Sequence, residues 1–321
     1  MIHDSDIAFH IPANVPFDWA ETGFFNFYVP EANLMAWVYI VHRAGVGATV
    51  ADVEIVDRWA RGIDEAVYMD MTNHNPIPAS AEKFSLPNGL SFEARSLREY
   101  LLEYKAGGVA LDLRCTSLME PYDIHDPAMD PLASPDPNAS GFGSAYANHF
   151  DMTAHTTGTM KVRGKSYTVD CVTTMDHSWG PRSERGMRPM GWINGNFSAT
   201  SAFQTIWSFD PMANGWDQFT LAHGYFIIDG QVRGLVKGRI RAIRPTDKSV
   251  FPHGYEAVLT DIDGREHVLF GTVIAQQPWA CYSCSMPAQS IVRWHYEGQE
   301  GVGQSQENWP LDLLTGRGFR P

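Results

Sequence analysis

Basic residues are scarce in this sequence. Lysine and arginine together number 24 against 37 aspartates and glutamates, which gives a formal net charge of −13 over 321 residues. The basic residues are also scattered, with no run of more than two. Because binding to nucleic-acid phosphates requires concentrated lysine and arginine, the composition argues against a nucleic-acid partner. An acidic surface mainly indicates solubility.

Long apolar runs are also missing. No stretch approaches about 18 consecutive apolar residues, so a membrane span is not expected. Residues 1–17 have neither the basic start nor the apolar run of a signal peptide. We therefore expect a soluble, cytoplasmic protein.

Motifs for metals and cofactors are few. The four cysteines are Cys115, Cys171, Cys281 and Cys284, and the last two form a CxxC without the second pair that completes a zinc site. We interpret these two as reduced thiols near a strand. The histidines show no HxH, HxxxH or HExxH spacing, and there is neither a Walker loop nor a GxGxxG after a strand. The sequence thus predicts no metal and no cofactor.

The length and the aromatic content indicate two well-packed domains. A chain of 321 residues suits two domains of roughly 150 residues better than one core. Hydrophobic residues make up 44% of the chain, and the ten tryptophans can fill cores or line cavities. The segment that follows Gly180-Pro181-Arg182 is polar and contains proline and glycine. We expect an N-terminal domain over 1–182 and a C-terminal domain over 183–321.

Strand patterns dominate the sequence. Residues 24–43 predict two β-rich runs joined by a turn-forming cluster at 30–33. Residues 96–106 fit a helix or a strand, and the Gly-Gly pair that follows favours the strand. Other strands rich in β-branched and aromatic residues are predicted at 109–118, 201–209 and 219–228, with hairpin tips at 106–108, 163–165, Asp229-Gly230 and Asp263-Gly264. Hairpins without intervening helices predict antiparallel β structure, in sandwiches or barrels.

Residues 120–146 form a long segment without a strand or helix pattern. It holds five prolines among many aspartates, serines and glycines. Loops beyond about 15 residues inside a compact domain are usually functional or mobile. The segment could be a lid over a barrel mouth or a plain surface excursion.

The stretch DHSWGPR (176–182) carries an acid, an imidazole, an indole and a guanidinium within seven residues. If 167–179 is one strand, alternation places His177 and Trp179 on its more apolar face, which should point inward. Asp176 then lies on the opposite face, away from His177. A bulge before Gly180 is the alternative, because it could turn either side chain inward.

Residues 158–182, GTMKVRGKSYTVDCVTTMDHSWGPR, resemble the signature of the carotenoid 1,2-hydratase (hydroxyneurosporene synthase) and AttH-like superfamily. The likeness extends more loosely to 21–40 and 223–240. It implies a mainly β protein built as two lipocalin-like (calycin) antiparallel β-barrels packed together. Members of that superfamily hydrate isoprenoid double bonds, and relatives cyclise polyketide–terpene skeletons. Where many relatives have arginine before the Asp-His pair, this chain has Met175, and the local acid in the preceding hairpin is Asp151.

Hydration or isomerisation of an alkene requires a proton delivered to carbon and stabilisation of a cation. Asp176 could deliver the proton if burial kept it protonated, and His177 could serve as acid or base. Trp179 offers a π face to a cation, and Arg182 could anchor a polar substrate group. The same residues could instead form a structural corner at the domain junction. Further candidates for substrate contact are His149, Tyr225 and Trp294.

The sequence and the resemblance together favour a cofactor-independent hydratase, isomerase or cyclase. Its expected substrate is a hydrophobic isoprenoid, polyketide or aromatic-derived molecule, with Asp176 and His177 as the catalytic residues. The alternative is a non-catalytic calycin-type protein that binds a hydrophobic small molecule.

Overall fold

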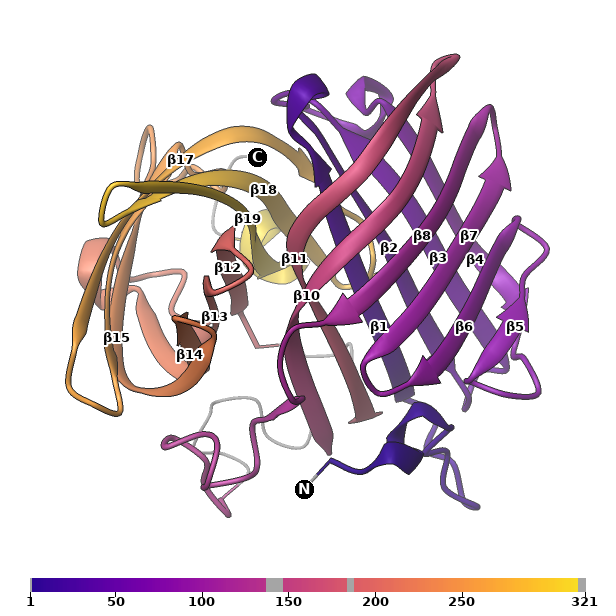
Figure 1. The fold of residues 1–321 in the computed structure, drawn as a ribbon, viewed down its shortest axis with the longest axis horizontal. Coiled ribbons are helices and arrows are strands. Elements are labelled where there is room, and N and C mark those ends of the chain that lie inside the picture. Colours follow the sequence, from indigo (N-terminus) through magenta and orange to yellow (C-terminus); the bar gives the residue numbers. More distant parts are fainter. Residues whose placement is uncertain (1, 137–146, 184–187, 317–321) are drawn as a thin grey trace. The chain divides into compact units, whose positions relative to one another are not determined.

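The computed structural model describes residues 2–136, 147–183 and 188–316, and these residues are mainly β (Figure 1). The chain divides into two compact units. The first contains a curled half-barrel sheet and the second a closed eight-stranded barrel. The predicted mainly β, double lipocalin-like fold is confirmed. Among the described residues, no helix is both long and apolar enough to cross a membrane.

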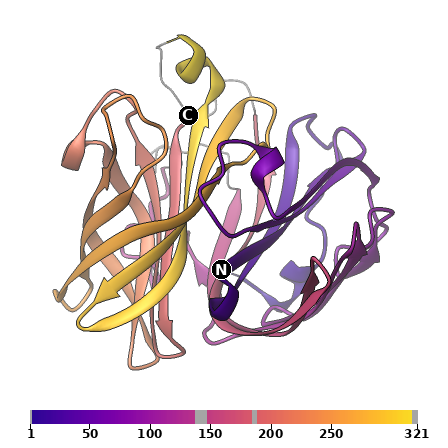
Figure 2. The ribbon, with the colours of Figure 1, turned by 90° about the horizontal axis from the view of Figure 1, so that it is seen from above.

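The first unit is one antiparallel sheet whose curvature is visible in Figure 2. Its strands are β1 (Trp19–Val29), β2 (Leu34–Arg43), β3 (Ala48–Val56), β4 (Tyr68–Pro76), β5 (Lys83–Ser85), β6 (Leu90–Ser96), β7 (Glu99–Ala106), β8 (Val109–Ser117), β9 (Tyr122–Asp123), β10 (Asn148–Val162) and β11 (Lys165–Pro181). Their order is β4-β3-β2-β1-β11-β10-β8-β7-β6-β5, with β9 beside β10. Because the path starts at β4 and ends at β5, this sheet is open, which differs from a closed barrel.

The sequence pattern explains where these strands form. In β8 buried and exposed residues alternate, as expected for a strand with one face in water. By contrast β2, with the sequence LMAWVYIVHR, is buried at nine of its ten positions, so it reads as a continuous apolar run. The strand assignment of 96–106 is confirmed by β7, whose Gly-Gly tip leads into β8.

The β10–β11 hairpin positions the DHSWGPR stretch. Its tip residues Arg163 and Gly164 both have positive φ, 50° and 77°, as a tight two-residue hairpin turn requires. From this tip the two strands pair without a register shift as far as Asn148 and Trp179. β11 also pairs with β1 in unbroken register. The bulge considered as an alternative is therefore absent from this described part of β11.

The second unit is a barrel in which each strand pairs with the next and the last closes on the first. The strands are β12 (Met190–Ser198), β13 (Ser201–Phe209), β14 (Phe219–Ile228), β15 (Gln231–Ile243), β16 (Gly254–Asp261), β17 (Glu266–Pro278), β18 (Ser285–Tyr296) and β19 (Gln299–Pro310), followed by α1 (Leu311–Gly316). The predicted strands 201–209 and 219–228 coincide with β13 and β14.

Aromatic side chains fill the barrel interior. Phe203, Phe226, Tyr255 and Trp294 belong to one buried cluster, and the rings of Phe203 and Trp294 meet edge to face at 5.1 Å. The packing is tight enough that a Cβ added to Gly195 would lie 2.4 Å from Phe203. Eight strands enclose an interior just wide enough for side chains to fill, and here they fill it.

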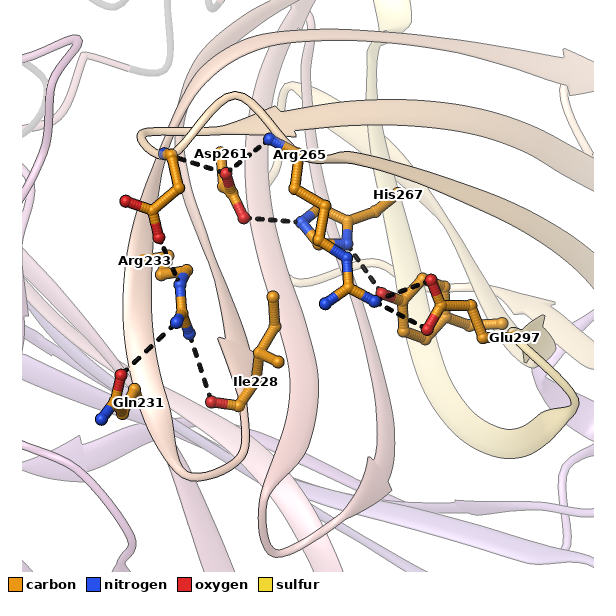
Figure 3. A network of polar contacts seen from close by, with 9 residues as sticks. Ile228, Gln231, Arg233, Asp261, Arg265, His267 and Glu297 are labelled. Carbon is orange, nitrogen blue, oxygen red and sulfur yellow. Dashed lines mark hydrogen bonds and ion pairs between the residues drawn. The ribbon is translucent and has the colours of Figure 1, made fainter.

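A polar network links residues from the strands β14 to β18 of the barrel (Figure 3). His267 lies between Asp261 and Tyr296, with its two ring nitrogens 2.9 Å and 2.8 Å from their oxygens. Arg265 binds both carboxylate oxygens of Glu297 at 2.8 Å. Both nitrogens of His267 are thus occupied, so we interpret this network as part of the fold.

Two segments from the first half of the sequence belong to the second unit. In the first, residues 58–66, which include the short helix η3 (Ile63–Glu65), the amide of Ala60 donates to the carbonyl of Gln276 at 2.7 Å. In the second, Asp130 is fully buried, 2.6 Å from Nδ1 of His223. Asp130 lies in the long segment 120–146. Because residues 137–146 of that segment lie outside the described residues, the lid remains a prediction.

Candidate active site

β11 presents Asp176 and His177 on opposite faces of the first sheet. The unbroken pairing with β1 and β10 keeps the alternation of side chains intact through Trp179. His177 lines a pocket on one face together with Met175, while Asp176 lies on the other face directly opposite Asp151 of β10. The two predicted catalytic residues thus belong to two separate groups of side chains.

The pocket on the His177 face is small and largely apolar. Its walls include Phe25, Ile40, Phe84 and Phe92, and its polar lining includes Glu21, His42, Tyr100 and His177. The cavity measures ≈ 30 Å³, which is room for about two water molecules. Asp6 and Ile7 of the 3₁₀ helix η1 (Asp4–Ile7) also contribute to its wall.

Histidine rings and one buried carboxylate surround this pocket. His10 Nδ1 lies 2.8 Å from Glu21 Oε1, and its ring stacks on Trp179 with the centroids 3.6 Å apart. His177 Nε2 lies 3.7 Å from the same oxygen of Glu21 and makes no hydrogen bond to any residue that the structure describes. We call His10, Glu21 and His177 the histidine triad.

Burial decides the charge state of two of these rings. It lowers the pKa of His177 to about 3, with further lowering by His10, His42 and His149. It also lowers the pKa of His42 to about 4. For His10, burial lowers the pKa, but the hydrogen bonds and charges of Glu21 and Asp6 outweigh it and leave the pKa raised. His177 is therefore neutral at physiological pH and offers a free lone pair.

On the opposite face, Asp176 belongs to a group that also contains His149, Asp151 and Arg182. We call these four residues the Asp176 cluster. Asp151 is buried, and its Oδ2 lies 2.9 Å from Nε2 of the equally buried His149. Arg182 donates to the hydroxyl of Ser178 at 2.8 Å. Asp176 itself remains partly exposed.

The Asp176 cluster raises the pKa of its central carboxyl group. Burial raises the pKa of Asp176 to about 7, and the neighbouring charge of Asp151 adds to this against the opposing effects of His149 and Arg182. Burial lowers the pKa of His149, but its contact with Asp151 outweighs this and leaves it raised. Near pH 7 the cluster therefore holds a proton that Asp176 can donate and take back.

The remaining candidate residues lie on the His177 face, in the Asp176 cluster or in the second unit. Trp179 lies on the His177 face, where it is buried against His10, whereas Arg182 and His149 accompany Asp176. Tyr225 and Trp294 belong to the second unit and are fully buried there. Trp294 packs in the barrel core and donates from its indole to the carbonyl of Asn194 at 2.9 Å, so its role in substrate contact stays a prediction.

Sequence reasoning missed His10 and Glu21. They lie more than 150 residues before His177, and no motif spacing connects the three. His10 follows a short 3₁₀ helix and Glu21 occupies β1, where its register partner is Trp179. The pairing of β1 with β11 brings Glu21 close to His177, and hydrogen bonds to Glu21 hold His10 beside them. The acidic Glu21 stands out in an otherwise apolar, β-rich run, but the sequence does not indicate which residues it contacts.

A family model for a domain of unknown function, DUF7064, matches residues 4–311. The chain belongs to this family. A search of curated proteins finds no significant match to the DUF7064 chain.

Solved structures share the fold of this DUF7064 chain. An AttH-like protein from Nitrosomonas europaea is similar with a TM-score of 0.60 and 12% identity, over 91% of this chain and 92% of that one. Kievitone hydratase from Nectria haematococca gives 0.54 and 12%, over 93% and 90%. CghA, solved with Sch210972, gives 0.56 and 10%, over 91% and 89%. The DUF7064 chain thus has the fold of AttH-like proteins over nearly its whole described length.

Proposed function

We propose that this protein is an enzyme of the hydratase or isomerase type, which adds a proton to a carbon–carbon double bond of a hydrophobic small molecule without a cofactor. The observation that carries the proposal is the Asp176 cluster, in which a partly exposed carboxyl group with a pKa of about 7 faces a buried acid–imidazole pair. The shared fold with kievitone hydratase supports it. So does the resemblance of 158–182 to the carotenoid 1,2-hydratase signature.

Asp176 has the surroundings that a proton donor to carbon requires. On one side Asp151 disfavours a second negative charge, which keeps the Asp176 proton in place. On the other side lies Phe24 of β1, which is buried and stands directly opposite Asp176 in the register. An apolar ring at this position limits the access of water to the acid and offers a π face to a cation.

The proposed reaction begins and ends with protonated Asp176. Protonated Asp176 gives its proton to one alkene carbon, which leaves a carboxylate and a carbocation. The positive charges of His149 and Arg182 stabilise the new carboxylate, since both favour ionised Asp176. In a hydratase, water then adds to the cation and loses a proton to the Asp176 carboxylate. In an isomerase or cyclase, the carboxylate instead removes a proton from a carbon of the rearranged cation.

The substrate class follows from the same chemistry. A carbocation survives only where water is scarce, so the reacting alkene must sit among apolar groups. Isoprenoids, prenylated aromatic molecules and polyene polyketides contain such alkenes. Aromatic side chains pack the interior of the closed barrel, which leaves little room there for the ligand of a calycin-type binding protein, the alternative function.

Proton transfer to carbon can be detected before the substrate is identified. The protein is incubated in D₂O with alkenes of these three classes and the products are analysed by mass spectrometry. A hydratase adds one D₂O, whereas an isomerase or cyclase introduces deuterium without adding water. For an alkene that the wild type converts, Asp176→Asn should lower the rate by about 100-fold or more, the usual effect of removing a general acid.

Asp170→Asn is the matched control. Asp170 lies on the same strand and the same face as Asp176, but it is exposed. This variant should keep the wild-type rate. Full activity in the Asp176 variant would remove the proposed mechanism. Absence of deuterium uptake by the wild type from every class would remove the proposed function for those substrates.

A further inference from the structure

The histidine triad brings three potential metal ligands together. One nitrogen of His10, one oxygen of Glu21 and one nitrogen of His177 all lie within 4.8 Å of one another. Two of the separations are 2.8 Å and 3.7 Å, both measured from Glu21 Oε1. Ligand atoms about 2.0–2.2 Å from a tetrahedral zinc ion are about 3.3 Å apart, between these two values. Small side-chain movements would therefore give all three atoms bonding distances to one ion.

Hydrogen bonding within the triad leaves one ligand atom without a partner. Glu21 is 1% exposed and accepts hydrogen bonds from the backbone and the ring of His10. His177 Nε2 is buried and receives none among the described residues. An unsatisfied buried polar atom costs about 1–3 kcal/mol of stability. The pairing of His10 with Glu21 therefore does not explain why Nε2 of His177 is buried beside them without a hydrogen bond.

The surroundings hold the rings in place for ligation. The ring of His177 is hydrogen-bonded to the backbone of Thr22, which fixes its tautomer and orientation. The ring of His10 is held by its stack on Trp179 with an interplanar angle of 3°. A hydrogen bond from the ring to the backbone, as His177 makes with Thr22, is typical of metal-binding histidines.

We propose that the histidine triad binds one divalent transition-metal ion of the zinc type. Two imidazoles and one carboxylate are a ligand set that zinc and its neighbours accept, with positions left open for water. The open side meets the pocket of ≈ 30 Å³, because Glu21 and His177 both line it. The site is separate from the proposed function, since His177 points away from the Asp176 cluster.

The ion would also fasten the N-terminal segment to the sheet. Among the three ligands, only His10 lies outside a strand, and it follows η1, whose residues Asp6 and Ile7 contribute to the pocket wall. Binding to the folded state alone raises stability in proportion to the logarithm of the free metal concentration. Metal addition should therefore raise the melting temperature.

Calorimetric titration of the full chain, treated with EDTA and dialysed, with ZnCl₂ tests the proposal. We expect one zinc ion per chain, a higher melting temperature, and the visible spectrum of tetrahedral cobalt when Co²⁺ replaces Zn²⁺. His10→Ala should weaken zinc binding by at least about 100-fold. This is more than the effect of removing a residue that only hydrogen-bonds to a metal ligand. Because His10 belongs to no strand, this change removes no strand pairing. His177→Ala and Glu21→Gln should have the same effect.

His155→Ala is the matched control. His155 lies on β10 and is exposed, with its Nε2 2.6 Å from Asp170. Zinc binding that survives this change but not the change at His10 supports the triad. Binding that His10→Ala leaves intact, or that His155→Ala abolishes, would overturn the assignment. So would the absence of stoichiometric binding to the wild type.

Discussion

The Asp176→Asn variant should gain stability relative to wild type as the pH rises. Folding raises the pKa of Asp176 from 3.8 to about 7. Between these two values the folded chain keeps a proton that the unfolded chain has released. The wild type therefore loses stability as the pH rises through this window, and above about pH 7 the loss is complete. Asparagine cannot ionise, so the variant escapes the loss.

The size of the effect follows from the same shift. One pKa unit corresponds to about 1.4 kcal/mol, so the two units between about pH 5 and pH 7 give at most about 2.7 kcal/mol. Asp176 is partly exposed, and solvent screening reduces this limit to roughly 1–2 kcal/mol. The free-energy difference between Asp176→Asn and wild type should increase by that amount from about pH 5 to about pH 8.

Urea unfolding followed by tryptophan fluorescence at the two pH values measures this difference. Asp112→Asn serves as the control, because Asp112 is an exposed acid of β8 in the same sheet. Its difference from wild type should stay constant with pH. If the Asp176 variant also keeps a constant difference, Asp176 does not hold the proton, and the reasoning behind the acid role fails.

Two further predictions concern the acid and the barrel. For a converted alkene, the rate of deuterium uptake should fall as the pH rises above about 7, because the protonated form of Asp176 is then lost; a rate that rises through this range would point to a base instead. Trp294→Ala should lower the stability of the barrel by about 3–5 kcal/mol in thermal unfolding, since Trp294 is fully buried. As a control, Trp59→Ala should lower the stability clearly less, because Trp59 is half-exposed.

Local patterns were sufficient to predict most strands and the two faces of β11. The hairpin tips at 163–165 and 229–230 and the strands β13 and β14 follow from turn residues and alternation, which act over a few residues. The opposite orientation of Asp176 and His177 follows from the same alternation. These features need no knowledge of which strands become neighbours.

Features that depend on distant pairing could not be predicted. The first sheet stays open because β4 and β5 do not pair, and nothing in either strand alone decides this. Likewise, His10 and Glu21 meet His177 only because β1 lies beside β11. Burial is the main cause of the raised pKa of Asp176, and Asp151, which the register of two long strands places opposite it, adds to the effect.

The second unit includes two segments that lie before its barrel strands in the sequence. Asp130 pairs with the buried His223, and Ala60 bonds to Gln276. A gene fragment starting after Arg182 would encode all eight barrel strands but would leave an imidazole and a strand end without these partners. Recombination between relatives at that point would separate the barrel from both segments. We therefore expect a fragment that starts after Arg182 to be less stable than one that also carries the segments near residues 60 and 130.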